Sequence, residues 1–354
     1  MKKQVPYLLK YSIQRILLLL VTTFIILTLT FFLIKRLPDA AITGNEASQY
    51  AFCQNQVSKG YYVVFNEAQQ GLGDLIIPKY KDPAGVTWYF YRKPMIQQYG
   101  AWLKGIFTEW DWGTSSAVDP GRTAMAIILS RIKPTVLINV VSLVIALPLG
   151  FAFGIWAALK KNKTTDNIIS TLVMVFISVP SFVIISLLRL WLAFSTGWLP
   201  SRWPASSATF GEYAKARVIP VLSISFGTIA GFTRYTRAEL TEVRSSEFLL
   251  LARTKGLTKR QCIIRHALRN SMVPIIPMVI GQFISILSGS IILEQLYSIN
   301  GIGSLYITAL NAKDWNVLLV DRAVYTVIGL IANLAVDLSY GIVDPRIRMG
   351  AKGA

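Results

Sequence analysis

Long apolar runs separated by short polar segments dominate the pattern along the chain. Six runs are long enough to cross a bilayer, since about 20 apolar residues are needed for one helical crossing. They cover residues 13–34, 135–159, 167–193, 218–236, 273–294 and 318–343. The first run is longer than the apolar region of a signal peptide, so we expect an uncleaved span. The pattern predicts an all-α polytopic membrane protein with about six transmembrane helices.

Basic residues are distributed unevenly between the segments that connect these runs. With the N-terminus inside, the inner segments contain 19 Lys and Arg residues, whereas the short outer loops contain 4. Cytoplasmic loops carry such an excess, so both termini are predicted to lie in the cytoplasm. The inner segments are 1–15, 160–166, 234–271 and 344–354, and the short outer loops are 195–217 and 295–317. This topology places Cys53 and Cys262 on opposite sides of the membrane and excludes a disulfide between them.

The span pattern divides the chain into four parts. An extracytoplasmic insertion is predicted between the first two spans, ending in an amphipathic helix (122–133) along the membrane interface. Within the insertion, the alternating VTWYFYRK stretch favours a small strand-containing unit. The parts are the N-terminus with the first span (1–34), the insertion with its interfacial helix (35–134), a five-span core with the cytoplasmic loop 237–271 (135–343), and a cytoplasmic tail (344–354).

Charge and motif content exclude several classes of function. A net charge of +18 could indicate nucleic-acid binding, but the basic residues lie in short segments bracketed by spans, which leaves no domain to enter a groove. The sequence lacks the G-x-x-x-x-G-K-[ST] phosphate loop and has a single histidine. We therefore expect no enzyme activity, no catalytic or metal-binding residues and no cofactor on this chain.

The basic inner segment EFLLLARTKGLTKRQCIIRHALRN (247–270) has the pattern of two short helices joined by a sharp turn. Ser246 is predicted to cap the first helix, with Glu247 in its first turn. Gly256 suits the left-handed conformation that ends a helix. Thr258 and Gln261 have the spacing of a capping box, which predicts an immediate second helix.

The predicted second helix is amphipathic. At 100° per residue, an apolar side is opposed by a basic side. The apolar side comprises Ile263, Ile264, Ala267 and Leu268, and the basic side comprises Arg265, His266 and Arg269. Such a segment can dock on the anionic inner leaflet or on another protein, and its composition alone leaves both open.

Residues 252–270 carry a resemblance to a known family. The stretch ARTKGLTKRQCIIRHALRN resembles the cytoplasmic loop of permease subunits in ABC importers of the peptide/nickel subclass, the OppB/DppB-type oligopeptide and dipeptide permeases. It fits the subclass pattern A-R-x-K-G followed by R-H-A-x-R-N, whereas the general importer pattern is matched only at Ala252, Gly256 and Leu268. Three further stretches resemble family segments: WDWGTS (110–115), Glu294 with NGIGSL (300–305, Asn300 replacing the usual proline), and DLSYGIVDPRIR (337–348).

The resemblance implies the fold of a type I ABC importer permease in a bacterial plasma membrane. It implies a subunit of an ATP-driven peptide importer whose inner loop seats on a cytoplasmic ATPase, with Phe248, Leu249 and Leu251 as an apolar knob. The residues expected to carry this coupling are Glu247, Phe248, Leu251, Ala252, Arg253, Lys255, Gly256, Arg265, His266 and Arg269. The implied partners are a second homologous permease, two ATPase subunits carrying ATP and Mg, an extracytoplasmic peptide-binding protein, the peptide substrate and membrane lipid.

Polar residues of the predicted fifth span are candidates for the translocation path. Gln282, Ser285 and Gly289 share one helical face, and Glu294 lies near the outer end. Helix-to-helix hydrogen bonding is the alternative reading of these residues. Alternative functions are import of nickel or another small ligand of the same subclass, and ion-coupled peptide carriage. Residues 38–104 are not accounted for by shorter family members, and we hypothesise that they dock the binding protein.

Overall fold

The computed structural model describes residues 5–37, 46–68, 75–81, 85–205, 207–285 and 289–343. The chain folds into two compact units. The first unit contains residues within 1–19, 132–304 and 328–354, and the second contains residues within 20–131 and 305–327.

Four helices in the described part of the chain are long and apolar enough to cross a membrane, and a bent helix pair brings the number to five. The last agrees closely with its predicted run, the first and second end where predicted but begin 8 and 11 residues earlier, and the third extends 8 residues beyond its run at both ends. These helices are α1 (Val5–Ile34), α4 (Ala124–Leu159), α7 (Phe210–Arg244) and α14 (Trp315–Val343).

Helix α4 joins two elements that the sequence predicts as separate. The interfacial helix at 122–133 and the second span at 135–159 form one helix of 36 residues with Pro134 and Pro148 inside it. The predicted break is therefore wrong. Proline inside a helix removes one hydrogen bond, and membrane helices tolerate this when neighbouring groups satisfy the freed carbonyl.

The third predicted span is not a single helix. Helix α5 (Thr164–Ser178) ends at Val179, and α6 (Ser181–Leu188) with the π-helical turn η3 (Arg189–Ser195) leaves at 98° to it. The prediction of one helix over 167–193 is wrong because Val179 precedes Pro180. The proline ring disfavours helical geometry at the preceding residue, and Val179 is extended with ψ 117°.

The fifth predicted span is also interrupted. Helix α11 (Ile275–Ser285) is followed after a gap in the described residues by α12 (Ile291–Leu296). Gly289 has a φ of +62°, and the hydroxyl of Ser290 accepts a hydrogen bond from the Leu293 N–H at 3.4 Å. A positive φ stops a helix and a serine cap starts the next. The prediction of one helix over 273–294 is therefore wrong.

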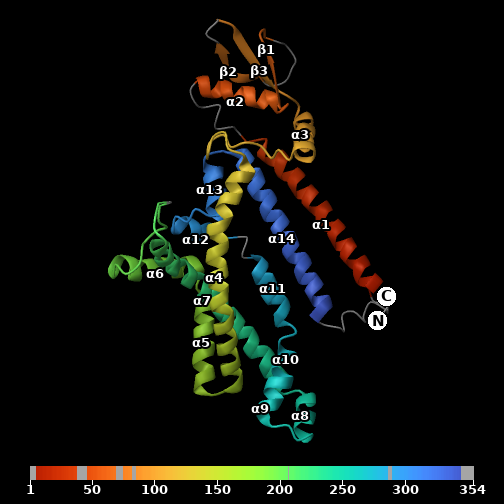
Figure 1. Cartoon of the computed structure of the whole chain (residues 1–354), viewed down its shortest axis with the longest axis vertical. Coiled ribbons are helices and arrows are strands. Elements are labelled where there is room, and N and C mark those ends of the chain that lie inside the picture. Colours follow the sequence, from red (N-terminus) through yellow and green to blue (C-terminus); the bar gives the residue numbers. More distant parts are fainter. Residues whose placement is uncertain are drawn as a thin grey trace. The chain divides into compact units, whose positions relative to one another are not determined.

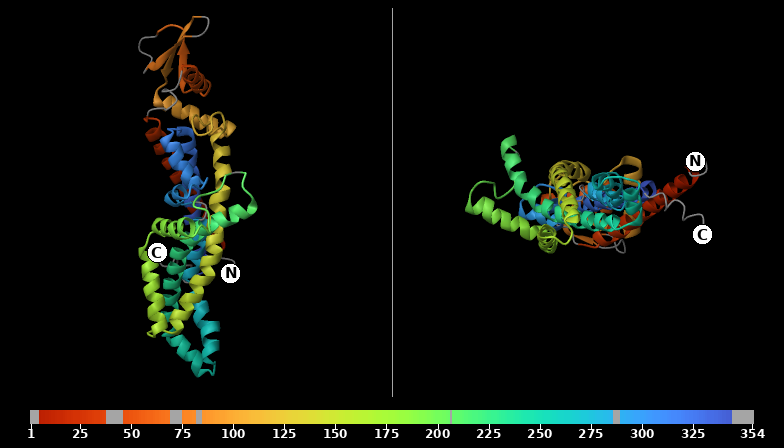
Figure 2. Two further views of the ribbon diagram at one scale, coloured as in Figure 1. Left: turned by 90° about the vertical axis from the view of Figure 1, so that its left-hand side faces the viewer. Right: turned by 90° about the horizontal axis from the view of Figure 1, so that it is seen from below.

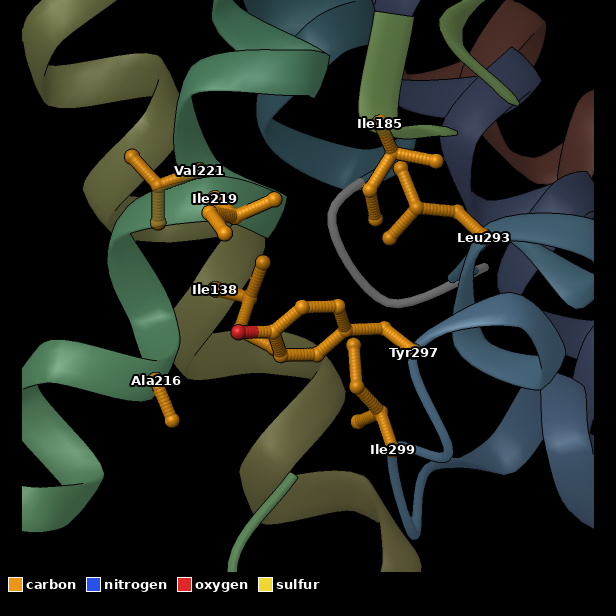
Figure 3. Packing of buried hydrophobic residues seen from close by; sticks show 8 residues of the cluster. All are labelled: Ile138, Ile185, Ala216, Ile219, Val221, Leu293, Tyr297 and Ile299. Carbon is orange, nitrogen blue, oxygen red and sulfur yellow. The ribbon is translucent and has the colours of Figure 1, made fainter. Parts of the chain in front are cut away.

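Figure 3 shows the buried apolar core of the first unit around the ring of Tyr297. Tyr297 is fully buried, and its hydroxyl donates a hydrogen bond to the Pro200 carbonyl at 2.5 Å. This core packs α4, α6 and α7 against α12 and the segment that follows it. Its members are Ile138, Ile185, Ala216, Ile219, Val221, Leu293, Tyr297 and Ile299.

Helices α4 and α7 approach closely at two glycines of the GFAFG stretch. A Cβ on Gly150 would lie 2.7 Å from the Phe232 Cβ, and one on Gly154 would lie 2.5 Å from the Thr236 Cβ. The spacing of two small residues four positions apart thus allows close helix contact here. The second stretch with this spacing, GTIAG, differs, because nothing lies within 4 Å of a Cβ on Gly227 or Gly231.

Substituting Gly154→Ala is expected to destabilise the purified chain by about 1–3 kcal/mol, because the added methyl overpacks the α4–α7 contact. The measurement is the midpoint of thermal aggregation in detergent. The matched variant Gly231→Ala adds the same methyl to open space and should leave the midpoint unchanged. Equal midpoints for the two variants would contradict the close approach.

The second unit contains a small antiparallel sheet, which confirms the predicted strand-containing unit (Figure 1). The strand order is β1-β3-β2, and helix α2, whose Cys53 is buried, packs against β1 and β2. The predicted VTWYFYRK strand is the central one. The elements are α2 (Glu46–Ser58), β1 (Tyr62–Phe65), β2 (Leu75–Lys81), β3 (Thr87–Arg92), α3 (Met95–Lys104) and the π-helical turn η2 (Gly105–Glu109).

A buried carboxylate fastens the WDWGTS stretch within the same unit. Asp314, between α13 (Ile302–Asn311) and α14, is fully buried. Its Oδ2 accepts a hydrogen bond from the Ser115 hydroxyl and from the backbone N–H groups of residues 116, 117 and 118, at 3.0–3.1 Å for the three N–H groups. Charged acceptors form the stronger hydrogen bonds of proteins. The loop after Gly113 is thus held by one carboxylate 199 residues from Ser115.

Candidate functional site

The basic segment forms the predicted elbow of two helices. Helix α8 (Glu247–Thr254) ends before Gly256, whose φ is +88°. The Thr258 hydroxyl accepts a hydrogen bond from the Gln261 N–H at 3.3 Å, and the Gln261 side chain accepts one from the Thr258 N–H at 3.0 Å. This capping box starts α9 (Lys259–Gln261) directly after the turn and confirms the prediction. Both helix ends at the elbow are therefore specified by local sequence.

The predicted side-chain cap at Ser246 is wrong. Ser246 occupies the N-cap position of α8, but no side-chain capping bond forms. Its hydroxyl instead donates to the Val243 carbonyl at 2.5 Å. The last carbonyls of a helix have no partner within the helix, and α7 ends only two residues earlier. The serine therefore completes the end of α7 rather than the start of α8.

The second helix of the elbow contains a π-helical turn that changes which side chains are buried. It runs through α9, η4 (Cys262–Ala267) and α10 (Leu268–Ser271). Cys262 and Ala267 are both fully buried, whereas Ile264, predicted on the same apolar side as Ala267, is 53% exposed. Hydrogen bonds from i to i+5 widen the turn and bring residues five apart to the same side.

A buried cluster attaches the elbow to the ends of α4 and α7. In this cluster, residues of α8 and of both ends of η4 pack against Ala158 of α4 and Leu240 of α7. The Arg244 side chain also donates a hydrogen bond to the Ala158 carbonyl. Because protein interiors are close-packed, a force on the elbow is passed to these helices. The buried members of this elbow cluster are Ala158, Leu240, Leu249, Ala252, Cys262 and Ala267.

The opposite face of α8 is apolar and exposed. Phe248, Leu250 and Leu251 are 43%, 64% and 57% exposed, whereas Leu249 is 2% exposed. The predicted apolar knob is therefore corrected, since Leu249 belongs to the elbow cluster and Leu250 takes its place. Ala252, expected to carry coupling, is also buried in that cluster.

The charged residues of the predicted coupling set lie in the same elbow as this apolar face. All but one of them are exposed, and His266 is half-buried. A desolvated apolar centre with charges at its margin is the arrangement of protein–protein interfaces, in which the centre anchors and the margin selects. The exposed members are Glu247, Arg253, Lys255, Arg265 and Arg269.

A second attachment of α7 escaped sequence analysis. The Arg237 guanidinium donates to both carboxylate oxygens of Asp166 at the start of α5, at 2.5 and 2.8 Å. Asp166 also accepts a hydrogen bond from the Asn162 N–H at 2.9 Å and is buried. Such bidentate pairs fix geometry as well as charge. The sequence signal for this pair is that Asp166 is the only acid close to the basic turn KKNK (160–163).

The three residues predicted to share one helical face, Gln282, Ser285 and Gly289, do not all lie on one helix. Gln282 lines a groove of about 350 Å³ between α7 and α11. The side chain of Ser285 lies outside the described part of the chain. Gly289 follows α11 with a positive φ, so the helical spacing behind the prediction does not reach it. The groove also contains Gly227, Thr228, Gly231 and Tyr235.

Glu294 is 3% exposed and does not lie on an open surface. Its Oε1 accepts a hydrogen bond from the Thr135 hydroxyl at 2.8 Å, and its Oε2 accepts one from the Ser304 N–H at 2.9 Å. Thr135 accepts in turn from the Ile302 N–H at 3.1 Å. The alternative reading, hydrogen bonding between elements, is therefore the one the structure supports at Glu294.

The NGIGSL glycines make room for this carboxylate. A Cβ on Gly301 would lie 2.4 Å from the Glu294 Oε2, and one on Gly303 would lie 3.1 Å from it. Any larger side chain would displace the acid. Glu294 and the glycines therefore form one structural unit, although Glu294 and Gly301 are seven positions apart in the sequence.

Comparison with known proteins identifies relatives over nearly the whole chain. The dipeptide transport system permease protein DppB of Lactococcus lactis is 32% identical over 96% of this chain and 99% of its own length. DppB of Bacillus subtilis is 29% identical over 97% and 99%. The oligopeptide transport system permease protein OppB of Haemophilus influenzae is 27% identical over 96% and 100%.

The fold is that of a type I ABC importer permease, as predicted. A solved subunit of the MetNI methionine ABC transporter, in an inward-facing conformation, matches 62% of this chain and 97% of its own with a TM-score of 0.50 at 14% identity. The profile of binding-protein-dependent transport system inner membrane components matches residues 150–349. The chain is thus a multi-pass membrane protein, and it belongs to the family of binding-protein-dependent transport system inner membrane components.

Proposed function

We propose that this chain is the transmembrane permease subunit of an ATP-driven peptide importer. With a second homologous permease, it forms half of the translocation path. Relatives named for dipeptide and oligopeptide transport cover nearly its full length and support peptide as the substrate class. Both termini and the elbow (residues 245–270) lie in the cytoplasm, in agreement with the excess of Lys and Arg in the inner segments.

The exposed apolar face of α8 is the observation that carries this proposal. Phe248, Leu250 and Leu251 point away from the elbow cluster, and the other exposed residues of α8 are charged or polar. Such a patch rimmed by charge is typical of a docking site for another protein. The partners are two cytoplasmic ATPase subunits, which bind ATP and Mg, because this chain has no phosphate loop.

The elbow cluster supports a mechanical route for coupling. Closure of the two ATPase subunits on ATP displaces α8. Leu249 and Ala252 are buried against Cys262, Leu240 and Ala158, so α8 moves together with the ends of α7 and α4. Packed interfaces switch between discrete arrangements rather than deforming continuously. The spans therefore change their packing when the ATPases close.

The substitution Leu251→Glu should release the ATPase subunits from the purified chain. A charge at the centre of a desolvated interface costs at least about 2 kcal/mol, or roughly 30-fold in affinity. The measurement is co-purification in mild detergent, with the partners identified by mass. The matched variant Leu159→Glu, at a 40%-exposed leucine of α4 outside the elbow, should retain them. A chain that purifies alone and supports uptake driven by a proton gradient would contradict the proposal.

The insertion is proposed to dock an extracytoplasmic peptide-binding protein. Its sheet and α2 form a compact fold, so residues 38–104 contain a structured surface rather than a simple linker. Capture of the binding protein by a chain lacking residues 38–104, compared with the full chain, tests this role. Unchanged capture together with unchanged uptake would exclude it.

A further inference from the structure

A groove of about 450 Å³ lies between α5 and α7, which run side by side in the first unit (Figure 2). The groove has a basic, polar end, and the rest of its lining is mainly apolar, with the hydroxyls of Ser178 and Thr233 among it. Arg234 and Arg237 of α7, with Ser170 of α5, line the polar end. The apolar wall is formed by Ile169, Val173, Met174 and Ile177 of α5.

Two arginines spaced three residues apart are presented to this groove. Arg237 uses its Nε and Nη2 to bind Asp166, which leaves Nη1 with no recorded hydrogen bond among the described residues. Arg234 is exposed, and no ion pair is recorded for it in that part of the chain. Arg234 and the Nη1 of Arg237 can therefore donate hydrogen bonds to a negatively charged group in the groove, while the other nitrogens of Arg237 neutralise Asp166.

The apolar wall continues from this polar end along α5. Ile169 and Ile177 are eight residues apart, so the wall is roughly 12 Å long. Met174 and Ile177 are 68% and 43% exposed, although they lie in a helix that belongs to a membrane span. A small anion such as free phosphate would contact none of this surface, whereas a molecule with a charged head and a hydrocarbon chain would cover both ends.

We propose that this groove binds an anionic phospholipid of the inner leaflet, its phosphate at Arg234 and Arg237 and one acyl chain along the apolar wall. The placement in the inner leaflet rests on the orientation given under the proposed function.

The surrounding charges favour an anionic lipid over a neutral one. The turn that leads into α5 carries Lys160, Lys161 and Lys163, all exposed. The nearest acid, Asp166, is already paired with Arg237. Basic clusters at the inner surface attract anionic headgroups, and basic pockets between spans on that side bind them specifically.

The test uses the assembled transporter in bilayers of equal parts phosphatidylglycerol and phosphatidylcholine. After gentle extraction, native mass spectrometry counts the lipids retained per complex. Arg234→Gln should reduce retained phosphatidylglycerol about fivefold, the effect of one charge near the surface. The matched variant Lys259→Gln removes the same charge from the exposed start of α9, away from the groove and from the Lys160–Lys163 turn, and should retain the lipid. Met174→Trp, which fills the apolar wall, should also reduce retention.

Three outcomes would overturn the proposal. The first is that the complex retains as much phosphatidylcholine as phosphatidylglycerol. The second is that Arg234→Gln retains as much phosphatidylglycerol as the unaltered chain. The third is that a photoreactive group at position 174 cross-links to the second permease instead of to lipid. Uptake is measured on the same samples. Intact uptake without specific lipid retention would refute the lipid site alone, and retained lipid without peptide uptake would refute the proposed function alone.

Discussion

Replacing Glu294→Ala is expected to prevent accumulation of folded chain in the membrane and to abolish uptake with it. The substitution leaves the Thr135 hydroxyl and the Ser304 N–H without an acceptor in a buried site. Each unpaired buried group costs about 1–3 kcal/mol, so roughly 2–6 kcal/mol is lost. Proteins are stable by only about 5–15 kcal/mol. The measurement is chain abundance in membranes together with thermal stability after purification.

Two further variants sharpen this prediction. Thr135→Val removes one of the hydrogen bonds to Glu294 and should give an intermediate loss of stability. Glu247→Ala removes an exposed acid from the first turn of α8, where the charge contributes less than about 1 kcal/mol. If Glu294→Ala accumulates as well as Glu247→Ala, the carboxylate does not hold this part of the fold together.

Substituting Asp314→Ala is expected to be the second most damaging change. The Ser115 hydroxyl and three backbone N–H groups all donate to one carboxylate oxygen, and none of them would keep that partner. Hydrogen bonds to charged groups are worth about 1.5–3 kcal/mol each, so the loop 115–118 should detach. Limited proteolysis is the measurement, with new cleavage expected in this loop.

The same loop provides a matched control for Asp314. Asp119 pairs with Arg122 at 3.2 Å, but both side chains are about half exposed, at 50% and 47%. Exposed ion pairs contribute about 0–1 kcal/mol. Asp119→Ala should therefore leave the proteolysis pattern unchanged. Similar cleavage in both variants would mean that burial of the Asp314 carboxylate does not hold the loop.

Local sequence signals were sufficient to predict the elbow. A capping box, a helix-ending glycine and the strand in the insertion each depend on residues within a few positions, and each was confirmed. Hydropathy also located α1 and α14 to within a few residues, apart from the polar start of α1. What hydropathy reports is the preference of a segment for lipid. It does not report backbone direction, and so the breaks at Val179 and Gly289 were missed.

The candidate site was harder to predict because its decisive contacts join distant residues. Thr135 and Glu294 are 159 positions apart, and Arg237 and Asp166 are 71 apart. No spacing rule connects such pairs in a single sequence. The π-helical turn at 262–267 was missed for a different reason, since the 100° periodicity used to assign faces assumes regular α-helix. Contact between the elbow and the ATPases stays a prediction.

The burial of both cysteines has a practical consequence. Cys53 is 5% exposed and Cys262 is fully buried in the elbow cluster, and the sequence contains no other cysteine. A thiol-reactive fluorophore or spin label therefore meets no accessible native thiol. The unaltered chain is already a suitable background for single-site labelling. A probe introduced by Phe248→Cys would report the movement of α8 during the nucleotide cycle in real time.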